Sequence, residues 1–451
     1  MCPAPLCILQ TLSYLGAFLA SWRLGVSVSS RLGSAKLPER ACGCYASCMG
    51  ADRAVWLRVG LAFVAFVLIG ASDGGLGVLL PSIQRSYSID KSTVSLLFLC
   101  GTSGYLTAAF TSGLLVERLG TRLFLTLGVG AFIAGAVSIG LGLPFFLLLA
   151  FYVVFFFGFG VLDAGLNTYI AGLPNNTSVL NNLHACYGLG ALIGPVVAQA
   201  FLDLRLGWNA VYLWWSSVAL LVLAGMWFAF RGVGRVRHEE GAGAGGNVLA
   251  ATLRLRVVWI VAIFLLLYVG GEVSLGNWSY SLLTEDRAVD PTPASWFVSG
   301  YWMGLTVGRL VLGRLAKRLG DRNLIQLCLG GVMAGLLLVW LPPWPIAAAA
   351  GLWLTGFSLG PIFPTVIAVL SRMVAPRVLP SAIGFVASAG SAGAAFFPWV
   401  AGNLAEGLGL WTLMPYVIGL SVLMLGCWWA IQSQPARDVE QKEMIAEGLG
   451  G

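Results

Sequence analysis

Ionisable side chains inside long apolar runs are the strongest chemical signal in this sequence. Four of them lie well inside such runs: Asp73, Asp163, Glu272 and Arg309. Placing a charged group at bilayer depth costs about 2.5–3.5 kcal/mol on insertion scales, so each should face a partner or an aqueous cavity. Carboxyl groups in such a cavity can exchange protons and bind the hydrogen-bonding groups of a polar solute. We therefore expect these four residues to form the functional site.

Both acids of the first half have polar or flexible neighbours. Asn167 follows Asp163 by one helical turn and lies on the same face. A carboxylate and an amide stacked in this way can bind a proton and a polar solute together, whereas the alternative is a structural hydrogen bond between helices. Asp73 is followed by Gly74 and Gly75, which weaken a helix and open backbone carbonyls to a cavity, although small residues also favour helix packing. We favour a cavity role for both acids.

The second half places Glu272 and Arg309 in consecutive apolar runs. They can form a buried pair that compensates the desolvation of both charges, or Arg309 can extend toward the cytosolic end of its helix. Asn277, Tyr301 and Trp302 lie in the same two runs, and we expect them to contact the solute together with Asn167. The two aromatic residues can stack on a sugar ring or serve as packing residues.

Other helices carry breaks and small residues. Pro361 and Pro364 interrupt the hydrogen-bond ladder of a helix and predict a bend where a gate can hinge. Gly190 and Gly194 form a small-xxx-small surface for close helix contact. His184 stands near the entrance of the same helix, where it can relay protons or cap the helix.

Composition places the whole chain in a membrane. Hydrophobic residues make up 58% of the 451 residues and charged residues only 10%. From residue 56 onward, twelve apolar runs are long enough to cross about 30 Å of hydrocarbon as helices. The predicted divisions are a disordered cytosolic tail (1–55), a six-helix bundle (56–231), a cytosolic linker (232–254), a second six-helix bundle (255–432) and a cytosolic tail (433–451).

The net charge of +7 is a topology signal and not a sign of nucleic-acid binding. Lys and Arg gather on the loops that share a side with both termini, which predicts that both termini are cytosolic. The sequons at Asn175, Asn176 and Asn277 then face the cytosol or lie within a helix, so we expect no glycosylation there. The nine cysteines do not have the spacing of a zinc module, and we expect no metal and no cofactor.

A short charged segment occurs twice, 200 residues apart. Its shared or aligned positions are Gly113, Glu117, Arg118, Gly120 and Arg122 in the first copy, and Gly313, Lys317, Arg318, Gly320 and Arg322 in the second. Basic loops on the inner side would explain the arginines but not the glycines in register. A duplicated six-helix unit explains both, and we expect these turns to take part in conformational change.

The pattern Gly-x-x-x-acid-Arg-x-Gly-x-Arg resembles the signature loop of the major facilitator superfamily, although Lys317 stands where an acid is usual in the second copy. Over roughly residues 56–432 the chain looks like the sugar-permease branch, close to fucose permease and to fungal bypass-of-stop-codon-type transporters. The resemblance implies an all-α membrane protein with twelve transmembrane helices in two bundles. It also implies that the acids of helices 1 and 4, here Asp73 and Asp163, serve proton coupling and sugar binding.

We therefore expect a proton-coupled symporter of a sugar or similar small polar solute, working as a monomer in the plasma membrane or an internal membrane. Asp73, Asp163 and Glu272 are the predicted proton-coupling residues. The sequence leaves two alternatives open. One is an antiporter of drugs or cations, because the acids could also recognise an amine or coordinate sodium. The other is a nutrient sensor that binds solute without moving it. Catalytic groups do not cluster, so we do not expect an enzyme.

Overall fold

The computed structural model describes residues 39–173, 176–233 and 246–434 of the chain. Within these residues every regular element is a helix and no strand occurs. The chain divides into two compact units, Met1–Arg53 and Ala54–Gly451. Helix α2 (Glu39–Gly74) begins in the first unit, and every other helix belongs to the second.

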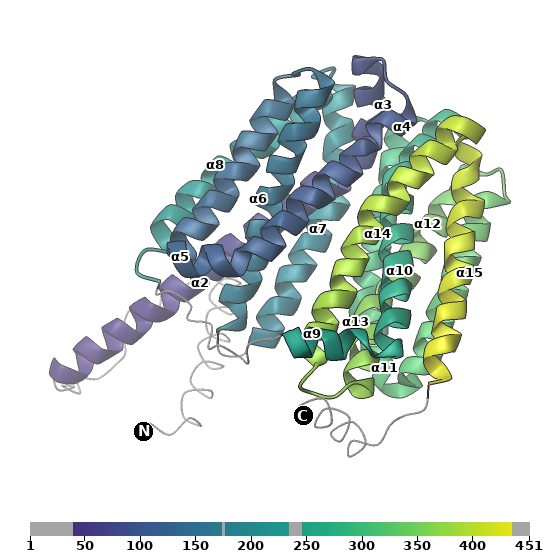
Figure 1. The fold of residues 1–451 in the computed structure, drawn as a ribbon. Helices are drawn as coiled ribbons and strands as arrows, with labels where there is room; N and C mark the ends of the chain where they lie inside the picture. Colours follow the sequence, from purple (N-terminus) through teal and green to yellow (C-terminus); the bar gives the residue numbers. More distant parts are fainter. Residues whose placement is uncertain (1–38, 174–175, 234–245, 435–451) are drawn as a thin grey trace, which may run out of the picture. The chain divides into compact units, whose positions relative to one another are not determined.

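The first half of the second unit continues α2 into α3 (Leu76–Tyr87) after an interruption at Gly75. The remaining helices of this half are α4 (Lys91–Val94), α5 (Leu96–Gly140), α6 (Phe145–Ala171), α7 (Asn176–Asp203) and α8 (Trp208–Ala229). Helix α5 packs along α6 and α8 (Figure 1).

The second half begins with the short helix α9 (Gly246–Leu253). It continues with α10 (Arg256–Ser281), the π-helical turn η1 (Leu282–Asp286), α11 (Pro291–Trp340), α12 (Pro345–Leu359), α13 (Ile362–Met373), α14 (Leu379–Leu408), the 3₁₀ turn η2 (Leu410–Thr412) and α15 (Leu413–Gln432). Helix α10 packs against α14 and α15, and α11 packs along α12 (Figure 1).

Helices α5 and α11 each hold two membrane-crossing segments that meet at a glycine. Gly120 has φ 77° and ψ 159°, and Gly320 has φ 73° and ψ 153°, a conformation that glycine adopts far more readily than other residues. The two copies of the repeated segment therefore make the same backbone turn.

The described residues contain ten candidate spans by length and hydropathy. One of them, Lys91–Gly140, is two spans because Gly120 divides it, and residues 291–319 of α11 supply one more before Gly320. The described chain thus crosses twelve times, and the predicted all-α fold of two six-helix halves is confirmed.

Two helices begin inside the segments that the sequence assigns to the tail and the linker. The sequence predicts a disordered tail up to residue 55, but α2 begins at Glu39, directly after Pro38 and in a stretch with several alanines. Proline favours the start of a helix and alanine its continuation. Similarly, the end of the predicted flexible linker forms α9. The rest of the tail, most of the linker and residues 435–451 lie outside the described residues.

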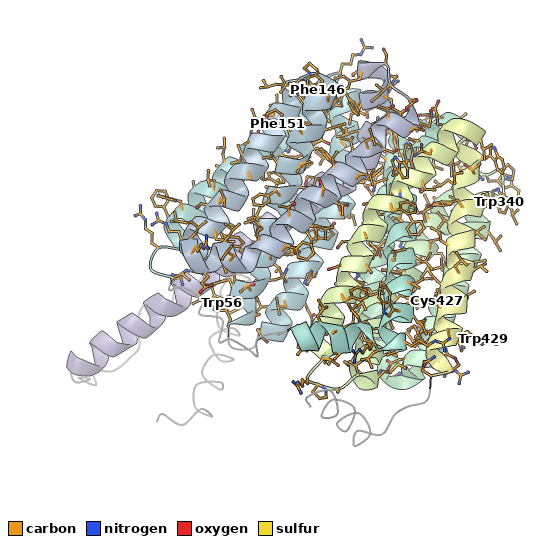
Figure 2. All side chains as sticks on the ribbon, in the orientation of Figure 1. Trp56, Phe146, Phe151, Trp340, Cys427 and Trp429 are labelled. Atoms are coloured by element: carbon orange, nitrogen blue, oxygen red, sulfur yellow. The ribbon has the colours of Figure 1, made fainter. Side chains whose placement is uncertain are left out.

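Large apolar side chains cover the outside of the helices, as a lipid-facing surface requires (Figure 2). Phe146 is 69% exposed and Trp429 is 76% exposed, and both project from the periphery of their helices in Figure 2. Trp428, the residue before Trp429, is buried, so one tryptophan of this pair packs inside the protein and the other lies on its outer surface.

Polar contacts join the two halves at the end where α3 stops and α4 begins. The Lys91 ammonium lies 2.9 Å from a carboxylate oxygen of Glu285, and its backbone N–H donates to Glu406. Nearby, the Tyr280 hydroxyl donates to Gln199 over 2.6 Å. Asp90 caps α4 next to Lys91, and hydrogen bonds from the side chain and backbone of Thr93 hold the pKa of Asp90 below its usual value. The two halves are therefore closed against each other at this end.

The close contact predicted for Gly190 and Gly194 is present between α2 and α7. A Cβ at Gly190 would lie 2.8 Å from the backbone nitrogen of Ala71 and closer still to the carbonyl oxygen of Val67. By contrast, a Cβ at Gly130 in α5 would meet nothing within 4 Å. Both glycines have helical neighbours, so only the packing differs.

We predict opposite effects for alanine at these two positions. Gly190→Ala should destabilise the protein by about 1–3 kcal/mol through overpacking, despite the higher helix propensity of alanine. Gly130→Ala should be neutral or stabilising. Thermal unfolding of the purified protein in detergent measures both, and equal melting temperatures for the two variants would contradict the described α2–α7 contact.

Candidate functional site

A cavity of about 400 Å³ lies between the two halves of the second unit. The first half contributes residues of α2, α3, α5, α6 and α7, and the second half residues of α10, α11, α13 and α14. All four ionisable residues singled out in the sequence line it: Asp73, Asp163, Glu272 and Arg309. Asn277 also lines it. The structure thus brings together residues that lie more than 200 positions apart.

Asp163 on α6 has the densest hydrogen bonding of the three acids. The Tyr105 hydroxyl of α5 donates to one carboxylate oxygen over 2.8 Å. The Asn167 amide donates to the other oxygen and to the Asp163 carbonyl, both over 2.9 Å. Asn167 therefore acts on Asp163 and does not itself line the cavity. Hydrogen bonds from two helices fix the direction of this carboxylate, which is what a binding group requires.

Asp73 lies in the last turn of α2, just before the interruption at Gly75. Its carboxylate accepts a hydrogen bond of 2.5 Å from the Tyr187 hydroxyl of α7. The close α2–α7 contact described above places this tyrosine beside the acid. The sequence does not reveal Tyr105 and Tyr187 as partners of the acids, because each tyrosine lies on a different helix from the acid that it contacts.

Glu272 on α10 is less completely satisfied. One carboxylate oxygen is 4.0 Å from the Arg309 guanidinium, which is longer than a direct hydrogen bond. The other oxygen is buried and makes no hydrogen bond of standard geometry among the described residues, although the Tyr268 hydroxyl lies close enough to interact with this carboxylate. Arg309 instead donates from Nε to the carbonyl oxygen of Gly360 over 3.2 Å. Of the two options that the sequence leaves open for Arg309, the structure places it in the cavity facing Glu272.

A second cavity of about 880 Å³ adjoins the first and shares Glu272, Arg309 and His184 with it. Pro364, the predicted hinge residue, lines this second cavity. The His184 ring packs edge to face against Phe66, with 5.8 Å between ring centres. In the described part of the chain, no three His, Cys, Asp or Glu side chains meet as metal ligands would.

Aromatic side chains of the first half form one wall of the cavity. Phe156 and Phe159 on α6 stack with 5.4 Å between ring centres and 13° between planes. Tyr152 and Phe98 line the same cavity. Sequence reasoning misses this wall because Phe156 belongs to a run of apolar residues in which cavity-facing and lipid-facing rings look alike.

Tyr301 and Trp302 lie elsewhere than the sequence predicts. They are 1% and 6% exposed, and neither lines either of the two cavities. The Tyr301 hydroxyl donates to the backbone carbonyl of Glu272 over 2.9 Å, so it holds α10 against α11. Glycine at position 276 leaves the space that the Trp302 ring fills. Both residues therefore support the cavity wall from behind.

The repeated turns lie outside the cavity. Gly113, Glu117 and Arg118 are exposed, and the Arg122 guanidinium lies 3.8 Å over the ring of Trp227. In the second copy Arg318, Gly320 and Arg322 are exposed. The side chain of Lys317 and the surroundings of Gly313 fall outside the described residues. Asp321, next to Gly320, forms an ion pair with Arg372.

Comparison with known proteins places the chain among transport proteins. The family model described as Major Facilitator Superfamily matches residues 62–281 and 268–447. Bypass of stop codon protein 6 of Saccharomyces cerevisiae is 25% identical over 83% of this chain and 80% of its own length. Glucose/mannose transporter GlcP of Bacillus subtilis is 22% identical over 80% of this chain and 93% of its own length. The crystal structure of a mutant nucleoside transporter, NupG, shares the fold, with a TM-score of 0.71, 13% identity and coverage of 83% of this chain and 99% of that one.

The cavity can be tested without knowing what it binds. In a background without the nine native cysteines, Ser391→Cys on the cavity-lining face of α14 should react with a water-soluble thiol reagent. Ser274→Cys on α10 is the matched control, because Ser274 is 0% exposed. We expect a rate difference on the order of tenfold or more, since a buried thiol reacts only after local opening. Similar rates at both positions would contradict a water-accessible cavity between α10 and α14.

Proposed function

Because the chain belongs to the major facilitator superfamily, we propose that it is a secondary active transporter that carries a sugar or similar small polar solute together with protons. One observation carries this proposal: three carboxyl groups and one guanidinium from both halves converge on a single cavity. Rocking of the two halves about such a cavity exposes it first to one side of the membrane and then to the other. One chain supplies the whole cavity, which supports action as a monomer.

The chemistry of the cavity favours a neutral polar solute with an apolar face. Three acids against one Arg make the site unfavourable for an anion. Asp163, Glu272 and Asn277 offer the acceptors and donors that hydroxyl groups need. The stacked rings of Phe156 and Phe159 offer a flat apolar surface on which one face of a sugar ring can lie. The similarity to a protein named glucose/mannose transporter supports the same solute class.

The cost of charge at this depth supports the proposed proton coupling. Asp73 and Asp163 have hydroxyl and amide partners but no cation within hydrogen-bond distance among the described residues. Protonation removes the negative charge that otherwise opposes closure of the cavity into a low-dielectric environment. We place the proton on Asp163 and Asp73 in turn, with the solute bound to the same groups, so that the two move together.

The distribution of Lys and Arg supports a cytosolic location for both termini. With that topology the polar contacts of Lys91 and Glu285 lie at the outer end, and the cavity shared by His184 and Pro364 lies toward the inner side. The structure then corresponds to an inward-facing form in our proposal. Breaking the outer contacts is the step that opens the cavity outward.

Uptake into proteoliposomes tests the coupling. An inward proton gradient should drive accumulation of a labelled hexose, and Asp163→Asn should abolish gradient-driven accumulation, because the amide cannot take up a proton. Asp290→Asn is the matched control, since Asp290 is exposed at the start of α11 and should keep the wild-type uptake.

Labelled deoxyhexoses, cationic solutes and a sodium gradient serve as parallel arms. Full proton-driven accumulation by Asp163→Asn would refute the assignment of the proton to Asp163. Cation uptake against an opposite proton gradient would identify an antiporter, and uptake driven only by sodium would replace the proton as the coupled ion.

The aromatic wall predicts a preference for rings. Phe156→Ala should weaken binding of a hexose by about 1 kcal/mol or more, because the apolar face of the sugar ring loses the surface against which it is buried. An acyclic hexitol has comparable hydroxyl groups but no ring face, so its weaker binding should change little. Phe146→Ala on the lipid-facing side of α6 is the matched control. Thermal-shift titration with both solutes measures the difference, and equal losses for hexose and hexitol would contradict stacking on Phe156.

A further inference from the structure

The bend predicted for the tenth membrane crossing falls at a helix interruption that lies directly against the charged residues of the cavity. Helix α12 ends at Leu359 and α13 begins at Ile362, with Gly360 and Pro361 between them. In an unbroken α-helix the N–H of residue 364 would donate to the carbonyl of Gly360, but Pro364 has no N–H. The Gly360 carbonyl therefore needs a donor from another helix.

That donor is Arg309, whose Nε–H bonds to the Gly360 carbonyl over 3.2 Å. The next carbonyl back, that of Leu359, accepts a hydrogen bond of 3.1 Å from the Tyr268 hydroxyl. Both donors come from helices that line the cavity, α11 and α10. Side chains of neighbouring helices thus satisfy two carbonyls at this interruption, whereas the N–H groups of Gly360 and Thr365 keep backbone bonds of helical spacing to Gly356 and Pro361.

The same guanidinium faces Glu272. Its terminal nitrogen is 4.0 Å from one carboxylate oxygen, and the other oxygen is buried without a hydrogen bond of standard geometry among the described residues, with the Tyr268 hydroxyl as its polar neighbour. A direct charge-assisted bond would shorten the first distance to about 2.7–2.9 Å. Arg309 consequently faces two acceptors with different nitrogens: Nε bonds to the Gly360 carbonyl, and a terminal nitrogen would have to move closer to bond to the Glu272 carboxylate.

Backbone packing makes the bend sensitive to Arg309. A Cβ at Gly360 would lie 2.6 Å from the backbone nitrogen of Arg309, so α11 and the bent helix touch without an intervening side chain. Tyr301 ties the Glu272 carbonyl to α11 over 2.9 Å. A small shift of the guanidinium therefore acts on the bend through direct contact.

We propose that Arg309 is a positioning residue that links the state of Glu272 to the bend at Gly360. When Glu272 is charged and free, it draws the guanidinium away from the Gly360 carbonyl. When Glu272 is protonated or bound to solute, the guanidinium stays on that carbonyl and stabilises the bent helix. The place of this link in transport rests on the proposed function, but the link itself does not need a solute.

Other groups near Glu272 must be separated from this effect. The titratable or charged side chains that share its cavities or lie against it are Asp73, Asp163, His184, Tyr187, Tyr268, Tyr301 and Arg309. A pH response that comes from Asp73, Asp163 or His184 would survive in Glu272→Gln. One that runs through Glu272 and Arg309 would be lost in either single variant.

Amide hydrogen exchange of the full chain in nanodiscs measures the bend without any solute. The exchange rates are first corrected for the intrinsic effect of pH. Protection across residues 358–366 should then differ by about fivefold between acidic and neutral pH in the wild type, because the local opening equilibrium of this segment is shifted. Glu272→Gln should show the acidic pattern at both pH values. Arg309→Gln should show no pH response, and the double variant should equal Arg309→Gln.

Two further variants sharpen the test. Pro364→Ala restores a backbone donor for the Gly360 carbonyl, so protection should be high and independent of pH. Arg287→Gln is the matched control, because Arg287 also donates to backbone carbonyls, those of Trp340 and Pro342, away from the cavity. It should keep the wild-type response. If Arg309→Gln fails to fold, Arg309→Lys retains the charge without the planar fork and should show a reduced response.

A wild-type pH response in Arg309→Gln or Arg309→Lys would overturn the link, as would equal effects of Glu272→Gln with and without Arg309. Flux of labelled glucose provides the separate test of transport. If no solute is carried but amide hydrogen exchange across residues 358–366 still depends on Glu272 and Arg309 together, the proposed function fails and the link stands. If flux is proton-driven but amide protection across residues 358–366 does not change in Glu272→Gln, the link fails and the function stands.

Discussion

Every polar group that is removed from water in this protein must find a partner inside the chain. In lipid this requirement permits helices, whose backbone groups pair within the segment, and it makes each break conspicuous. At the interruption around Gly360, two backbone carbonyls accept hydrogen bonds from side chains of neighbouring helices: Arg309 donates to Gly360 and Tyr268 donates to Leu359. In the same way Trp278 of α10 donates to the carbonyl of Pro398 in α14 over 2.9 Å. Such side-chain donors join one helix to the next.

The three acids of the cavity meet this requirement to different degrees. Asp163 is held by three hydrogen bonds, and Asp73 by one from Tyr187. Two of the three bonds at Asp163 reach its carboxylate and one reaches its carbonyl. Glu272 retains a buried oxygen without a hydrogen bond of standard geometry among the described residues. This gradation means that the three carboxyl groups are not equivalent. An acid with its direction fixed suits recognition, whereas one that lacks a partner is the more ready to change its bonding when a proton or solute arrives.

Much of the fold and part of the site could be predicted from sequence because they follow from local physics. The apolar runs, the glycine turns at Gly120 and Gly320 and the cost of intramembrane charge need no knowledge of tertiary contacts. Side-chain direction is different. Tyr301 and Phe156 are both aromatic residues in apolar helices, yet the first supports the wall from behind and the second lines the cavity. Helical period alone cannot separate these faces when lipid, protein and cavity all accept an aromatic ring.

The two halves share a backbone plan but use different side chains to anchor it. At the first turn, Arg122 lies over Trp227 and so attaches the turn to α8, a helix without a break. At the second, Asp321 pairs with Arg372 in α13, which is the part of the bent helix beyond Gly360. A change in the bend therefore acts at both ends of α13, through Arg309 near the cavity and through Asp321 at the turn. The first half has no such connection among its described contacts, so the duplicated unit has become asymmetric: one half supplies the aromatic wall and a fixed carboxylate, and the other supplies the movable charge and the bend.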